Sequence, residues 1–236
     1  MQKFTHIINE NNSDDISKMI DYTNIKSSLT IDQIKEICNT AIDKKYHAVC
    51  ILPESVSSAA AFLDNTDVKI CTVISFPNGD NSTKEKIVET NDAIVAGAEE
   101  IDMVMNYKKL ISLDKLDEED KNDTYDDIVQ DIRSVSKLCH SNGVILKVII
   151  ETGALTFQQI KTACDICEIS GADYIKTSTG LLKEEDSLDT KLQKVKYIRT
   201  LIPDFINIKA SGGIRSIEDA NKFKPYVERI GTSNSI

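Results

Sequence analysis

Short apolar segments alternate along this chain with longer segments in which apolar residues recur at helical spacing. Eight of the short segments have the length and the apolar or β-branched composition of buried strands. They centre on residues 19–21, 47–53, 69–76, 100–105, 144–151, 172–176, 205–209 and 227–231. Helical patterns separate successive strands, over residues 31–41, 56–63, 82–95, 125–141, 156–170, 188–201 and 216–223. The pattern is that of a repeated strand–helix unit.

Eight such units in one chain predict a closed parallel barrel, the TIM (β/α)8 fold, with catalytic groups at the carboxyl ends of the strands. The length of 236 residues suits a single domain over 1–236, because barrels of this kind commonly use about 200 to 250 residues. An open doubly wound sheet is the alternative. It is disfavoured because no Gly-x-Gly-x-x-Gly follows any predicted strand.

The charge balance limits the partners that the chain can have. There are 28 basic and 38 acidic residues, a net charge of -10, which disfavours nucleic acid and anionic membrane surfaces as partners. An anionic ligand would therefore need a local positive pocket. Many of the acidic residues lie in 112–127, which we interpret as a solvated loop and the start of a helix. No apolar run approaches the roughly 18 residues of a membrane span, and the N-terminus lacks the apolar region of a signal peptide. A cytoplasmic location is expected.

The cysteines and histidines show no metal-binding pattern. The six cysteines are scattered through predicted core segments, as expected of reduced thiols. Cys164 and Cys167 share a core-facing helical stripe with Ile160 and Ala163, so packing explains them better than zinc. A faint likeness to a calcium loop after Asp120 fails, because Tyr125 stands where that loop requires glycine. No metal site is expected.

Lys176 is the first candidate for chemistry. It ends the apolar run 172–176 and is followed by hydroxyl residues and Gly180. Strand alternation puts Tyr174 and Lys176 on one face and Ile175 on the other, so packing of Ile175 under a helix would point Lys176 into the barrel. A charged amine is costly when enclosed, and a neutral amine is a nucleophile for carbonyl groups. The alternative is a lysine in solvent at the end of a strand.

Two further predicted strands carry lysines, Lys147 and Lys209. Three ammonium groups in one interior would repel one another, which lowers the pKa of at least one of them. The sequence therefore predicts an interior with an activated amine.

These segments resemble deoxyribose-phosphate aldolases. The resemblance runs from Met19-Ile20-Asp21-Tyr22-Thr23 to Gly231-Thr232-Ser233, and its anchors are Glu100-Ile101-Asp102, the segments 146–153 and 175–180, and Lys209-Ala210-Ser211-Gly212-Gly213-Ile214-Arg215. It implies a TIM barrel that reversibly cleaves 2-deoxy-D-ribose 5-phosphate to acetaldehyde and D-glyceraldehyde 3-phosphate. It also implies that the partners are small molecules and that no metal or other cofactor is used.

The resemblance assigns roles to individual residues. Lys176 would form the Schiff base, Lys209 would keep Lys176 partly neutral, and Asp102 would be the general acid and base, or an ion-pair partner of the lysines. Lys147, Asp21, Cys50 and Thr177 match supporting positions, although core packing explains Cys50 equally well. The matched phosphate-binding positions are Gly180, Gly212, Gly213, Arg215, Gly231 and Ser233.

The sequence departs from the family pattern in three places. Residues 181–185 replace a small or glycine-rich turn after Gly180, and Asn234 stands where a second serine is common. No helical pattern follows the last strand before Ile236, so the eighth helix is expected to be missing or truncated. The groove beside that strand would then be covered by the N-terminal segment or by a partner chain, which makes a homodimer possible.

Two other functions remain open at this point. The chain could be another Schiff-base aldolase or a transaldolase-like barrel that acts on a different sugar phosphate. It could also be a sugar-phosphate-binding barrel without catalysis. The presence of Asp102, Lys176 and Lys209 argues against a pure binder, which has no need of three enclosed charges that perturb one another.

Overall fold

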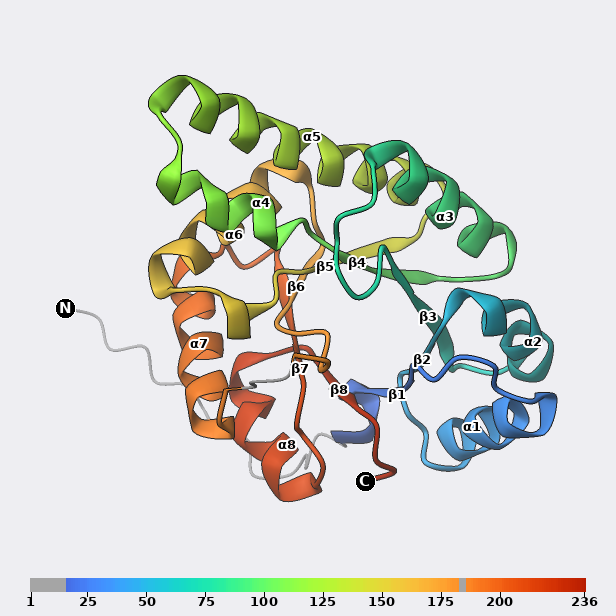
Figure 1. Cartoon of the computed structure of the whole chain (residues 1–236). Helices are drawn as coiled ribbons and strands as arrows, with labels where there is room; N and C mark the ends of the chain where they lie inside the picture. Colours follow the sequence, from blue (N-terminus) through green and yellow to red (C-terminus); the bar gives the residue numbers. More distant parts are fainter. Residues whose placement is uncertain (1–15, 183–185) are drawn as a thin grey trace.

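The computed structural model describes residues 16–182 and 186–236, and its strands form one closed parallel barrel (Figure 1). The strands follow chain order around the barrel, and β8 closes it by pairing with β1 through Ile20 and Ile230. They are β1 Ile20–Asn24, β2 Ala48–Ile51, β3 Lys69–Ile74, β4 Glu100–Val104, β5 Ile145–Ile149, β6 Tyr174–Lys176, β7 Asn207–Ser211 and β8 Arg229–Thr232. The predicted barrel and its eight strands are confirmed within the described part of the chain.

The helices surround the barrel as an outer ring (Figure 1). They are α1 Ile31–Asp43, α2 Pro53–Leu63, α3 Thr83–Val95, α4 Tyr107–Ser112, α5 Glu118–Ser141, α6 Phe157–Ser170, α7 Leu188–Leu201 and α8 Ile217–Phe223. Short 3-10 turns lie at Ile16–Met19, Leu113–Lys115, Thr152–Ala154 and Lys224–Tyr226. None of these described helices is long and apolar enough to cross a membrane.

Because both α4 and α5 follow β4, helix α8 precedes strand β8. The described residues after β8, 233–236, contain no helix, in agreement with the sequence pattern. Instead, the Tyr46 hydroxyl donates a hydrogen bond of 2.6 Å to the carbonyl oxygen of Ile236. The Ile236 side chain packs against the hydrophobic core. Residue 236 thus lies beside Tyr46, in the segment that joins α1 to β2.

The helix starts agree with local capping chemistry. The side chains of Thr30, Ser82 and Thr156 accept hydrogen bonds from backbone N–H groups in the first turns of α1, α3 and α6, each in a reciprocal capping box. Pro53 falls at the end of the predicted strand 47–53, but in the structure it begins α2. Proline fits this first position because its missing N–H would have no partner within the helix.

The expected loop and helix start in 112–127 are present, but the predicted start of the helix at 125 was too late. Helix α5 begins at Glu118, well before the predicted start at 125, and the Asp117 side chain caps it by accepting from the N–H of Asp120 at 3.0 Å. Carboxylates are stabilised near a helix N-terminus, where the N–H dipoles point toward them. The acidic residues therefore belong to the exposed first turns of a helix as well as to the loop that precedes it.

Successive side chains along each strand point alternately outward, toward the helices, and inward, toward the barrel axis. Outward-facing residues such as Ile101, Met103 and Ile175 are fully buried in the large core between barrel and helices. Inward-facing residues include charged side chains, among them Asp102, which is also fully buried. The parallel register places Asp102 beside Lys147 and Lys176 beside Lys209. The alternation expected from the sequence thus turns several charges toward the barrel axis.

Candidate active site

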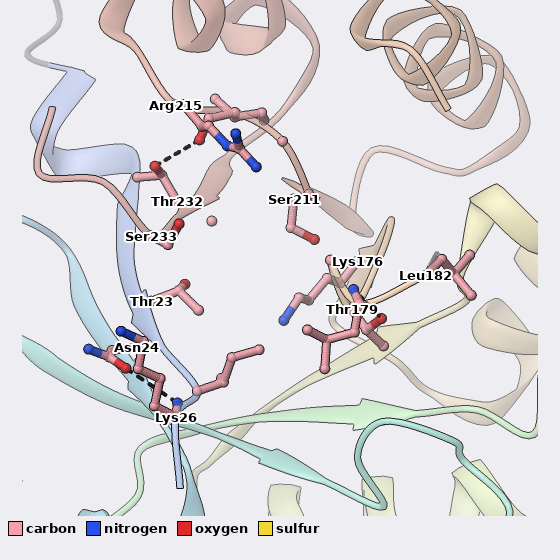
Figure 2. Close-up of a pocket in the computed structure, with 17 residues that line it drawn as sticks. Thr23, Asn24, Lys26, Lys176, Thr179, Leu182, Ser211, Arg215, Thr232 and Ser233 are labelled. Atoms are coloured by element: carbon pink, nitrogen blue, oxygen red, sulfur yellow. Dashed lines mark hydrogen bonds between the residues drawn. The ribbon is translucent and has the colours of Figure 1, made fainter. Parts of the chain in front are cut away.

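A cavity of about 580 Å³ opens at the carboxyl ends of β1, β6, β7 and β8 (Figure 2). Its lining includes Lys176 and all six residues predicted to bind phosphate. The lining residues are Thr23, Asn24, Ile25, Lys26, Lys176, Thr179, Gly180, Leu181, Leu182, Ser211, Gly212, Gly213, Ile214, Arg215, Gly231, Thr232 and Ser233. In Figure 2 the Lys176 amine reaches from β6 toward the open centre, facing Thr23 and Ser233.

Lys176 lines the cavity and also contacts the charged side chains buried beneath it. Its side chain is only 4% exposed, and its Nζ lies 2.7 Å from Asp102 Oδ2. Lys147 and Lys209 are fully buried and do not line the cavity. Of the three interior lysines, only Lys176 is therefore placed to meet a ligand.

Asp102 lies at the centre of the charge cluster. Its Oδ2 accepts from both Lys176 and Lys209 at 2.7 Å, and its Oδ1 accepts from Lys147 at 2.9 Å. Burial alone would raise the pKa of Asp102, but the three ammonium groups hold that pKa well below its usual range. Asp102 is therefore an ionised carboxylate, which accepts hydrogen bonds and can accept a proton.

Two further carboxylates balance the lysines. Asp21 Oδ2 lies 2.5 Å from the Nζ of Lys209, and Glu100 Oε2 lies 2.5 Å from the Nζ of Lys147. Burial lowers the pKa of both lysines, but their carboxylate neighbours outweigh it and raise each pKa well above its ordinary value. These two amines are therefore held as ammonium ions.

The sequence expectation of three mutually repelling lysines was incomplete because it left out Glu100. Burial alone would raise the pKa of Glu100, but the Lys147 charge and a contact with His47 at 2.9 Å lower it below its usual range. Glu100 and Asp102 are two residues apart on one strand, so alternation could have placed both inside. Carboxylates thus lie between the lysines and offset their mutual repulsion.

Cys50 is close to the charge cluster, as the family resemblance implied, and Cys71 joins it. The Cys71 thiol lies 3.1 Å from Asp102 Oδ1, and the Cys50 thiol lies 3.9 Å from Asp102 Oδ2. A hydrogen bond from Cys71, together with the charges of Lys209 and Lys176, lowers the pKa of Cys50 to about 7, although burial opposes the shift.

The two sulfur atoms and a carboxylate oxygen of Asp102 lie within 4.8 Å of one another, a spacing that could suit a metal ion. However, both oxygens of Asp102 already accept from ammonium groups. The donor set therefore fits a lysine-neutralising network better than a metal site.

The segment after Lys176 is held from both sides. From β7, Ser211 N donates to Thr177 Oγ1 at 3.0 Å, and Ser211 Oγ donates to the carbonyl of Ser178 at 2.6 Å. From the β5 side, the Glu151 carboxylate accepts from the Thr179 hydroxyl at 2.5 Å and from its N–H at 3.2 Å. Glu151 does so from a left-handed backbone conformation with φ of 57°. These bonds fix the path from Lys176 to Gly180.

The glycines predicted to bind phosphate form one wall of the cavity. Gly180, Gly212 and Gly213 have φ of 80°, 87° and 76°, conformations that glycine adopts without strain. Gly231 has a different reason to lack a side chain, because a Cβ there would lie 3.3 Å from Lys209 Cε and 3.2 Å from Ser211 Cβ. Close packing and backbone conformation thus both require glycine on this wall.

Several lining residues were missed at the sequence level. Thr23 and Asn24 end β1, Lys26 follows it, and Ser211 ends β7. Their place at or just after the carboxyl ends of strands was a usable signal, since ligand sites of such barrels lie there. Lys26 adds a cation to the lining in addition to the expected Arg215, and Figure 2 shows the two on different sides of the cavity.

The departures from the family pattern lie at the edge of the cavity. Leu181 and Leu182 line it, whereas residues 183–185 lie outside the described residues. The Asn234 side chain donates to the carbonyl of Arg215 at 3.1 Å, and its N–H donates to Thr232 Oγ1 at 3.1 Å. Asn234 therefore ties the chain end to the loop after β7.

Comparisons with known proteins agree with this geometry. The family model described as "DeoC/LacD family aldolase" matches residues 10–229. A deoxyribose-phosphate aldolase of Treponema denticola is 40% identical over 94% of this chain and 97% of its own length. One of Caldanaerobacter subterraneus is 39% identical over 94% of this chain and 90% of its own length.

Solved structures show the same similarity in three dimensions. A crystal structure described as that of "a putative deoxyribose-phosphate aldolase from Coccidioides immitis" superposes with a TM-score of 0.80 at 37% identity, covering 93% of this chain and 82% of that one. The family model and the curated relatives each cover nearly the whole chain. The chain therefore belongs to the DeoC/LacD family of aldolases.

Proposed function

We propose that this protein is a class I aldolase that cleaves 2-deoxy-D-ribose 5-phosphate to acetaldehyde and D-glyceraldehyde 3-phosphate, and that also runs the reverse reaction. The observation that carries the proposal is the position of Lys176. Its amine reaches the cavity, is hydrogen bonded at 2.7 Å to a buried carboxylate, and shares that cavity with the glycine wall. Imine chemistry and phosphate binding can therefore take place in one space.

In the cleavage direction, the Lys176 amine attacks the C1 aldehyde of the open-chain sugar, and loss of water gives an iminium ion. Removal of the proton from the C3 hydroxyl then breaks the C2–C3 bond and releases D-glyceraldehyde 3-phosphate. The electron pair of that bond moves into an enamine on Lys176. Protonation of the enamine carbon and hydrolysis of the imine release acetaldehyde and restore the amine.

Asp102 and Lys209 are proposed to move the protons. Lys176 must lose a proton before it attacks, and Asp102 Oδ2 at 2.7 Å is placed to accept it. Lys209, an ammonium ion 2.7 Å from the same oxygen, can return a proton through Asp102 or through a water molecule. Lys147 and Asp21 are proposed to hold this network in position, and Thr177 to fix the backbone that follows Lys176.

The phosphate group is proposed to lie against the glycine wall with Arg215 and Ser233, where backbone N–H groups can donate to its oxygens.

We propose no metal or cofactor, because the iminium ion itself accepts the electron pair. We also propose that the protein acts in the cytoplasm on small molecules, without nucleic acid or membrane partners, and that it forms a homodimer. A related deoxyribose phosphate aldolase from Aeropyrum pernix, 26% identical, is described as tetrameric. Sedimentation velocity would distinguish a dimer of this chain from a tetramer or a monomer.

The test is reduction with borohydride in the presence of acetaldehyde, followed by peptide mass spectrometry. We expect one two-carbon unit on Lys176, because only an imine is trapped in this way. Modification of Lys147 or Lys209 instead would overturn the assignment. Analysis of the products formed from 2-deoxyribose 5-phosphate distinguishes this activity from that of another Schiff-base aldolase, and absence of any adduct would favour a binding protein.

A further inference from the structure

A buried lysine outside the cavity contacts the glycine wall from behind. Lys191 lies in the first turn of α7, is 5% exposed and does not line the cavity. Its Nζ donates a hydrogen bond of 2.8 Å to the carbonyl oxygen of Gly212. That carbonyl belongs to the peptide group that joins Gly212 to Gly213, and both glycines line the cavity. Lys191 therefore acts on a peptide group of the ligand-binding wall.

Because a peptide group is planar, the hydrogen bond to the Gly212 carbonyl also orients the N–H of Gly213. In a trans peptide the C=O and the following N–H point in opposite directions. The Gly212 carbonyl is held toward α7, which belongs to the outer ring of helices (Figure 1). The Gly213 N–H is therefore directed away from Lys191, and Gly213 itself lines the cavity. The two glycines have φ of 87° and 76° and carry no side chains, so neither of them can hold this orientation through a side chain of its own.

The charge of Lys191 adds to the effect of orientation. The whole chain carries a net charge of -10, which repels a phosphorylated sugar at long range. Arg215 and Lys26, the cations on the cavity rim, are exposed, so solvent screens them. Lys191 is buried, where a charge acts through a lower effective dielectric constant. Its ammonium also polarises the peptide whose N–H faces the cavity.

We propose that Lys191 is a positioning residue that fixes the Gly212–Gly213 peptide with its N–H toward the substrate phosphate, and so sets the preference for phosphorylated over unphosphorylated 2-deoxyribose. This inference rests on the proposed function. It assigns a specificity role to a side chain that touches neither the substrate carbonyl nor Lys176.

The test is Lys191→Met, which keeps much of the volume but removes the donor and the charge. We expect the KM for 2-deoxyribose 5-phosphate and the inhibition constant of inorganic phosphate to rise about tenfold or more, the scale of losing a charge-assisted hydrogen bond. The KM for 2-deoxyribose and the kcat values should change by less than about twofold. Lys191→Arg, which restores a charged donor, should recover part of the loss.

The matched control is Lys86→Met. Lys86 is likewise a buried lysine on a helix, and it lies between α3 and α5, where it pairs with Asp131 and does not line the cavity. Lys86→Met removes the same charge as Lys191→Met. If both variants raised the KM for 2-deoxyribose 5-phosphate equally, long-range charge would explain the effect and the proposal would be overturned. Equal losses with both sugars in Lys191→Met would also overturn it, because a purely structural role does not distinguish phosphate. If Lys191→Met does not fold, Lys191→Gln, which keeps an amide donor without the charge, should give a smaller rise confined to the phosphorylated sugar.

The proposed function and this inference fail differently. If the wild-type protein does not cleave 2-deoxyribose 5-phosphate, the proposed function is wrong. If the wild-type protein cleaves it and Lys191→Met binds inorganic phosphate as tightly as wild type, only the role of Lys191 is wrong.

Discussion

The amine of Lys176 and the Oδ2 atom of Asp102 lie 2.7 Å apart below the cavity, although 74 residues separate them in the chain. They come from β6 and β4, strands that are not neighbours in the barrel. The contact therefore crosses the interior rather than following the sheet. Because Asp102 is fully buried, little solvent screens its charge, and a change at this carboxylate should alter the electrostatic environment of the Lys176 amine.

Asp102→Asn should lower kcat by about 10²-fold or more, the usual scale for losing acid–base assistance. The amide keeps the shape of the carboxylate but cannot accept a proton from Lys176. Steady-state kinetics with 2-deoxyribose 5-phosphate would measure the effect. Asp80→Asn is the control, since Asp80 pairs with Lys108 at the surface. Retention of more than a tenth of wild-type kcat in Asp102→Asn would exclude Asp102 from proton transfer.

Lys209→Leu should reduce turnover at neutral pH by about 10²-fold or more while leaving Lys176 as the site of borohydride trapping. Lys209 supplies an ammonium donor 2.7 Å from Asp102 Oδ2, and leucine supplies none. Loss of the pair with Asp21 should also lower the melting temperature, so the kinetics must be measured well below it. Lys222→Leu, on the exposed face of α8, serves as the comparison. Near-normal turnover in Lys209→Leu would contradict its role.

Gly213→Val should weaken binding of 2-deoxyribose 5-phosphate by about 2 to 4 kcal/mol, the order of one or two charge-assisted hydrogen bonds. At φ of 76° a β-branched residue is strained, and its side chain would occupy the approach to the backbone donors. Kinetics with unphosphorylated 2-deoxyribose should be almost unchanged, because its reacting carbons lie at Lys176. Equal losses with both substrates would show that the glycine serves only the turn.

Acid should destabilise the fold through the buried carboxylates. The folded-state pKa values of Asp102 and Glu100 are lowered, so each carboxylate stabilises the fold fully above its unfolded pKa of about 4. That stabilisation is lost as the pH falls below about 4 toward the folded-state values. Urea unfolding between about pH 3 and 6 should show a smaller pH dependence for Glu100→Gln than for wild type. A pH dependence equal to that of wild type would mean that Glu100 is not ionised in the folded protein.

A metal chelator should leave the cleavage rate unchanged, because the iminium ion on Lys176 supplies the electron sink that a metal would otherwise provide. Cleavage of 2-deoxyribose 5-phosphate would be followed after prolonged exposure to the chelator and again after adding divalent ions. Inhibition that added metal reverses would count against the amine mechanism and would direct attention to the cluster of Cys50, Cys71 and Asp102.

The sequence by itself determined the fold class and predicted which lysine is the candidate for the reacting amine. Period-two and period-3.6 patterns are local, and eight repeats of them suffice to predict a parallel barrel. Alternation around Ile175 predicted that Lys176 faces inward, and its burial agrees. The exposed first turns of α5 were misread because their acidic residues give no apolar periodicity, although they suit a helix N-terminus.

Only the tertiary structure decided which charges meet. Glu100 received no role from its local sequence, yet strand register brings it to Lys147, and barrel closure brings Asp21 to Lys209. The contact of Lys191 with Gly212 likewise depends on how α7 packs beside β7. Such pairings join residues far apart in the chain, and their energies depend on burial and on distances of about 3 Å. Local periodicity fixes the direction of a side chain on its own strand, but not the distance to its partner on another.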